Sequence, residues 1–133
     1  MRRSLSSVAL SLLATVVLLV GCASTGDLRR GAGGSSFQVS GKSYDEVWNT
    51  AVEVVGRSLT IVESDKMAGT LKAEARAGAA TWGEVVGVFI SPLTPAAASY
   101  TVEVQSLKRM RTQVTGQDWE PAIVAGMKAR LGL

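Results

Sequence analysis

The feature that most constrains this chain is its single cysteine, Cys22, placed at the end of an apolar N-terminal run. Met1-Arg2-Arg3 gives a short positive start, and the 16 residues Leu5 to Val20 are almost wholly apolar or small. This layout is typical of a secretory signal peptide. With residues 1–21 removed, 112 residues remain, enough for one domain with a modest core. One cysteine cannot form an intramolecular disulfide, so that domain must be stabilised by its core alone.

The run Leu19-Val20-Gly21-Cys22 resembles the lipobox of bacterial lipoproteins. The resemblance implies that the Cys22 thiol receives a diacylglyceryl group, that cleavage precedes it, and that the new amine is acylated, for example with palmitate. Ala23, where some Gram-negative lipoproteins carry aspartate, favours the outer membrane, facing the periplasm. The alternative is a membrane-spanning anchor, but 16 apolar residues fall short of the roughly 20 that a spanning helix needs.

Composition excludes several classes of function. The chain has no histidine, which removes Ser-His-Asp and Cys-His nucleophiles and histidine-bearing zinc sites. Acylation of Cys22 leaves no thiol nucleophile. Without Arg2 and Arg3, 12 basic side chains stand against 11 acidic ones, so the formal charge gives no reason to expect nucleic acid. We therefore expect no enzyme, no cofactor and no metal site.

Residues 22–36 are rich in glycine and serine, which predicts a flexible tether after the lipidated cysteine. A free chain of 14 such residues spans about 20 Å root-mean-square. Arg29 and Arg30 could touch anionic lipid from this tether or simply be solvated. The folded domain is expected over residues 37–133, beginning with a short strand at Phe37-Gln38-Val39.

Two amphipathic helices are predicted. Ser43-x-x-Glu46 matches a capping box, and apolar residues then recur at three- and four-residue steps as far as Leu59. Asp118 is a good N-cap for a second helix that continues to the C-terminal region, with Pro121 tolerated in its first turn.

Between the helices, the pattern predicts strands over Thr60–Ser64, Thr70–Arg76, Glu84–Ile90 and Tyr100–Leu107, and a short one over Arg111–Thr115. The order β-α-β-β-β-β-(β)-α indicates an α+β fold, with a single antiparallel sheet of about five strands and two amphipathic helices on one face.

The block from Ser43 to Trp48, followed by Ile61 to Ala73 with its Asp-Lys and glycine turn, resembles a pattern of small bacterial envelope lipoproteins. It is similar to the helix-grip repeats of the C component of the outer-membrane barrel assembly machine, and to uncharacterised lipoprotein families of about this size. The resemblance implies the fold and an envelope location, and no catalytic signature accompanies it.

The strand Glu84–Ile90 is apolar or small on both faces, which is unusual for a sheet with helices on one side only. Val85 and Phe89 would face water unless something covers them. Either the loop that contains Pro92 and Pro95 folds over them, or a partner protein or second copy does. The set Val85, Phe89, Pro92 and Pro95 is therefore a candidate partner-binding surface.

A second candidate is the basic patch Lys108, Arg109 and Arg111, which could meet lipid headgroups or an acidic partner, or could be a solvated hairpin end. The carboxylates Glu63, Asp65, Glu74 and Glu84 show no spacing that singles out a catalytic pair. The sequence thus favours a non-catalytic binding or accessory module, anchored in the membrane through Cys22. The alternative is a carrier that holds a lipid or small amphiphile in a helix-grip pocket.

Overall fold

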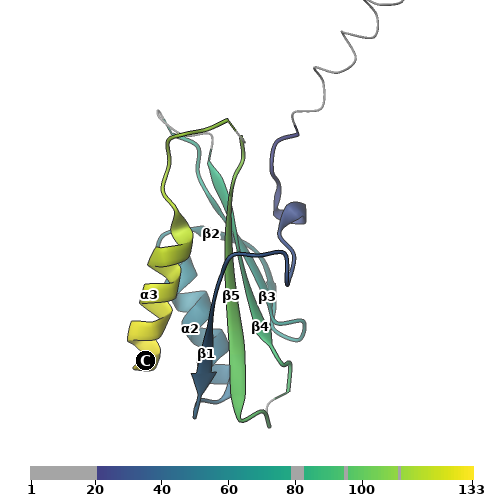
Figure 1. The fold of residues 1–133 in the computed structure, drawn as a ribbon, viewed down its shortest axis with the longest axis vertical. Helices are drawn as coiled ribbons and strands as arrows, with labels where there is room; N and C mark the ends of the chain where they lie inside the picture. The colour runs from purple at the N-terminus through teal and green to yellow at the C-terminus, as the bar shows by residue number, and fades with distance from the viewer. Residues whose placement is uncertain (1–20, 79–82, 95, 111) are drawn as a thin grey trace, which may run out of the picture.

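A computed structural model describes residues 21–78, 83–94, 96–110 and 112–133. It has one five-stranded antiparallel sheet in the order β1-β5-β4-β3-β2, with two α-helices packed on one face (Figure 1). The predicted α+β class and strand count are confirmed. The elements are η2 (Thr25–Asp27), β1 (Ser35–Ser40), α2 (Tyr44–Gly56), β2 (Thr60–Asp65), β3 (Thr70–Ala75), β4 (Glu84–Ser91), β5 (Ser99–Lys108) and α3 (Trp119–Leu131).

Both helices begin where their caps predict. The Ser43 hydroxyl accepts a hydrogen bond from the Glu46 amide at 3.2 Å, and the Glu46 carboxylate accepts one from the Ser43 amide at 2.9 Å. The Ser43 amide and hydroxyl both donate to the Glu46 carboxylate, and these two bonds to its ionised form lower the pKa of Glu46. Asp118 accepts a bond from the Glu120 amide at 3.2 Å at the start of α3. Each helix therefore has orphan amides satisfied by side chains.

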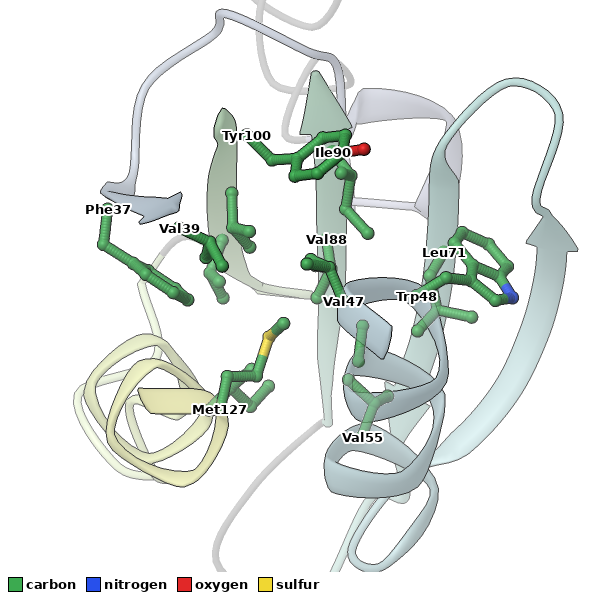
Figure 2. Packing of buried hydrophobic residues seen from close by; sticks show 14 of the residues in the cluster. Phe37, Val39, Val47, Trp48, Val55, Leu71, Val88, Ile90, Tyr100 and Met127 are labelled. Atoms are coloured by element: carbon green, nitrogen blue, oxygen red, sulfur yellow. The ribbon is translucent and has the colours of Figure 1, made fainter. Parts of the chain in front are cut away.

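The main core lies between the helices and the sheet, where Val47 of α2, Val88 of β4 and Met127 of α3 meet (Figure 2). All three side chains are at most 1% exposed. At the border of this core, Tyr100 lies beside Ile90 and Trp48 beside Leu71. A bidentate pair between Arg130 of α3 and Glu53 of α2 joins the helices at the surface, with nitrogen–oxygen distances of 2.6 to 3.0 Å. The Arg130 hydrogen bond lowers the pKa of Glu53.

One predicted element is wrong. Residues 112–115 form no strand, while Arg111 lies outside the described residues. The loop is fastened instead by Gln113, whose side-chain amide donates to the buried Glu84 carboxylate at 3.1 Å and to the Thr115 carbonyl at 2.8 Å. Among the described residues, no helix is long and apolar enough to cross a membrane.

Candidate functional site

The face of the sheet turned away from the helices, here the outer face, is covered by the chain itself. Val85 and Phe89 are 0% and 3% exposed, and they form a small second core with Leu28, which is 2% exposed. Leu107 packs against this cluster. The two-sided character of the strand is confirmed, but its cover comes from a segment that composition predicted to be a tether.

The flexible-tether prediction for residues 22–36 is therefore wrong. Residues 22–34, the anchor segment, run along the outer face, on the opposite side of the sheet from the helices (Figure 1), and β1 starts at Ser35. Near the segment's start, Ser24 and Asp27 close a short 3₁₀ turn, with the Ser24 amide donating to the Asp27 carboxylate at 2.7 Å. This turn directs Leu28 onto the sheet.

Gly87 leaves the space on the outer face that Leu28 occupies. It lies between Val85 and Phe89 on the outer face, and a Cβ there would stand 3.4 Å from the Leu28 Cβ and 2.9 Å from the Phe89 ring. A larger side chain at position 87 would therefore compete with both for space. Because Gly87 has no side chain, Leu28 can pack between Val85 and Phe89.

Arg30 fastens the far end of the anchor segment. Its guanidinium donates to the carbonyls of Ile90 at 2.6 Å and Ala68 at 2.7 Å, and also to the Ser91 hydroxyl. It lies over the Phe89 ring, 5.7 Å from the centroid, in cation–π geometry. The sequence allowed Arg30 to contact lipid or to be solvated. In the structure, its guanidinium instead donates hydrogen bonds within the fold.

Three hydrogen bonds to backbone groups of Arg29 and Gly31 also hold the anchor segment. The Arg29 amide donates to the Gln105 side chain at 3.1 Å, and the Gln105 amide group donates back to the Arg29 carbonyl. The Gly31 amide donates to the Glu103 carboxylate at 2.8 Å. Polar residues on the outer face of β5 therefore satisfy backbone groups of the anchor segment.

Cys22 is exposed and lies beside the end of β5. The Ala23 amide donates to the Arg109 carbonyl at 2.7 Å, which fixes the residue after the cysteine to the domain. Cys22 borders a groove of about 560 Å³ lined also by Asp27, Leu107 and Lys108. The structure thus brings together the lipidation candidate and Lys108 and Arg109 of the predicted basic patch.

The other predicted site residues are dispersed. Pro92 is exposed in the β4–β5 loop and takes no part in the Leu28 cluster, while Pro95 lies outside the described residues. Of the four acidic candidates, Glu74 and Glu84 line one open pocket, and Glu63 and Asp65 are not among its lining residues. Glu63 pairs with Lys72 at 3.1 Å, and Glu74 with Arg109 at 2.7 Å, so these carboxylates serve local structure.

The carrier interpretation requires a cavity between the helices and the sheet. That space is filled by the main core (Figure 2). A shallow groove of about 200 Å³ does lie at the seam between α2 and α3, lined by residues such as Val54, Trp119 and Gly126, and it opens to solvent. A larger pocket of about 330 Å³, lined by Trp119 and by Glu74 and Glu84 of the sheet, also opens to solvent, so both hollows lie at the margin of the main core.

No protein-family model matches the chain, and no curated protein matches it in sequence. Among solved structures, the chain is similar to the adenylate sensor from AMP-activated protein kinase, solved in complex with 5-aminoimidazole-4-carboxamide 1-β-D-ribofuranotide. The identity is 10%, the TM-score is 0.45, and the match covers 77% of this chain and 98% of that one.

Proposed function

We propose that this protein is a lipoprotein of the bacterial outer membrane, attached through diacylglyceryl-Cys22, whose α+β domain acts from the periplasmic side as a non-catalytic binding or accessory module. The proposal rests on the sequence Leu19-Val20-Gly21-Cys22. It is supported by the exposure of Cys22 and by the hydrogen bond that joins the next residue, Ala23, to the domain. An exposed thiol at this position is open to acylation and can hold lipid without disturbing the core.

Stable attachment follows from chain number. A single acyl chain binds membranes only marginally, whereas two or more give durable anchoring. A diacylglyceryl thioether on Cys22 supplies two chains, and acylation of the new amine adds a third. The domain then needs no membrane-spanning segment of its own to stay at the bilayer.

The central test is Cys22→Ser in cells supplied with labelled palmitate. The variant should carry no label and should appear as an unprocessed precursor, because both acylation and cleavage depend on the thiol. Labelling of the Cys22→Ser protein equal to that of the native protein would refute the anchor.

A matched variant tests the destination separately. Ala23→Asp retains Cys22 and the backbone amide that bonds to Arg109, so lipid labelling should persist. In a Gram-negative host, the labelled protein should shift from the outer-membrane to the inner-membrane fraction. Unchanged fractionation would count against outer-membrane sorting while leaving the lipid anchor standing.

A further inference from the structure

We propose that the end of the sheet beside Cys22 is a membrane-contact surface that binds anionic phospholipid headgroups and holds the domain in one orientation. This anchor-end surface comprises Cys22, Arg76, Lys108, Arg109 and Val114. The inference rests on the proposed lipid anchor and goes beyond it, because a lipid anchor on a flexible tether would impose no orientation.

The first argument is the length of chain between the anchor and the domain. A free tether of 14 residues would leave the domain about 20 Å from its anchor on average. Here the residue after Cys22 is already bonded to Arg109, at 2.7 Å from amide nitrogen to carbonyl oxygen. The glycerol of the lipid therefore lies within a few side-chain lengths of Lys108, and the anchor raises the effective headgroup concentration around it.

The second argument is the character of the side chains at this end. Arg76 comes directly after the last residue of β3, and Lys108 is the last residue of β5. Neither has a salt-bridge partner among the described residues. Arg109 is balanced by Glu74. Val114, in the loop that reaches over the same end, is 92% exposed. Cations beside an exposed apolar side chain fit the boundary between anionic headgroups and acyl chains.

The carboxylates at this end are engaged within the fold. Glu84 is 2% exposed and accepts a bond from Gln113, and Asp27 accepts the Ser24 amide. Asp118 caps α3. Arg76 is exposed and Lys108 half-buried, and neither is paired with an acid among the described residues, whereas Glu84, Asp27 and Asp118 each accept a hydrogen bond from a donor within the fold.

The opposite end of the sheet provides an internal contrast. Met67, in the β2–β3 turn, is 87% exposed, nearly as much as Val114. The neighbouring cation, Lys66, is paired with Asp45 at 3.0 Å, and Asp65 accepts the Ala68 amide in the same turn. An exposed apolar residue is therefore present at both ends. The cations near Met67 use their donors within the fold, Lys66 on Asp45 and Arg30 on backbone carbonyls, whereas Cys22 and the two cations without a salt-bridge partner lie together at the other end.

The experiment uses the mature, lipidated protein carrying one added thiol, Val114→Cys or Met67→Cys, labelled with an environment-sensitive fluorophore. Each labelled protein is reconstituted into phosphatidylcholine vesicles with or without phosphatidylglycerol. With phosphatidylglycerol, the label at position 114 should shift to the blue and be quenched by brominated acyl chains, while the label at position 67 should remain as in water. Mass spectrometry and vesicle flotation establish lipidation independently.

Charge variants test the headgroup assignment. Arg76→Gln and Lys108→Gln should each lower the ratio of quenched to unquenched label at position 114 about fivefold, which corresponds to about 1 kcal/mol per basic side chain near an anionic surface. Lys66→Gln, at the other end, should leave the ratio unchanged.

Equal signals at positions 114 and 67, or a position-114 signal that ignores phosphatidylglycerol, would overturn the orientation while leaving the anchor intact. A protein whose mass shows no lipid would overturn both proposals.

Discussion

Replacing Leu28 by alanine tests whether the anchor segment is docked on the outer face. Leu28 is 2% exposed and covers Val85 and Phe89, which are themselves buried. The substitution removes three carbon atoms, worth about 0.8 kcal/mol each when buried, or roughly 2.4 kcal/mol in all. The cavity contribution seen in closed cores should be small, because the anchor segment can settle into the space that is vacated.

The assay is urea unfolding, followed by far-ultraviolet circular dichroism, of a chain that begins at residue 22 and carries Cys22→Ser. Met67→Ala is the matched control, because it truncates a similar apolar side chain that is 87% exposed, and it should change stability by less than about 0.5 kcal/mol. A second readout is trypsin cleavage after Arg29 and Arg30, which should accelerate up to roughly 60-fold in Leu28→Ala if cleavage follows opening of the segment.

A Leu28→Ala protein as stable as the Met67→Ala control, with cleavage at the native rate, would refute the docked segment. The free-tether interpretation predicts that result, since a solvated leucine contributes nothing to the folded state. Loss of stability without faster cleavage would mean that Leu28 acts only on global unfolding.

Two further predictions concern the ends of the segment and the helix pair. Gly33 and Gly34 both have positive φ, 113° and 107°, but a Cβ at Gly34 would strike the Val104 carbonyl whereas one at Gly33 meets nothing within 4 Å. In urea unfolding, backbone strain should lower the free energy of unfolding of each alanine variant by about 1 kcal/mol or more. The loss should be clearly larger for Gly34→Ala. Equal losses would refute the close approach. Because the Arg130 hydrogen bond lowers the pKa of Glu53 in the folded state below its ordinary 4.5, its stabilisation is present above pH 4.5 and lost as the pH falls through the folded value. The urea midpoint of Glu53→Gln should therefore fall less steeply than that of the native protein below pH 4.5, and parallel curves would exclude the contribution.

Local rules predicted most of the regular structure. The capping box at Ser43 and the N-cap at Asp118 determine where the helices begin, because they satisfy amides that the helix itself cannot. Alternation placed Leu71 and Ala73 on the buried side of β3, where both are at most 1% exposed. These features depend on neighbours close in sequence, so the sequence alone determines them.

The pairing of distant segments could not be obtained that way. β1 pairs with β5, about 65 residues away, and nothing in its short pattern specifies that neighbour. The 112–115 stretch looked extended, but Gln113 turns inward to Glu84 and the local chain follows it. Both outcomes depend on tertiary contacts that compete with local propensity.

The anchor segment shows how such a contact could have been found. Val85 and Phe89 required a cover, Gly87 between them left room for one, and Leu28 is the one large apolar side chain between Cys22 and Phe37. The high glycine and serine content predicted a free tether instead, because composition is an average over a segment. Burial depends on single side chains, here Leu28.

The same match limits any partner that would bind Val85 and Phe89. Such a partner must first displace Leu28, so its apparent affinity is reduced by the population of the open form. If Leu28 contributes about 2.4 kcal/mol to docking, a partner of this face should bind Leu28→Ala up to roughly 60-fold more tightly than the native protein. Displacement of Leu28 would also free the chain next to Cys22. Leu28 therefore opposes two changes at once: exposure of the outer face, and release of the domain from its contacts at the anchor end.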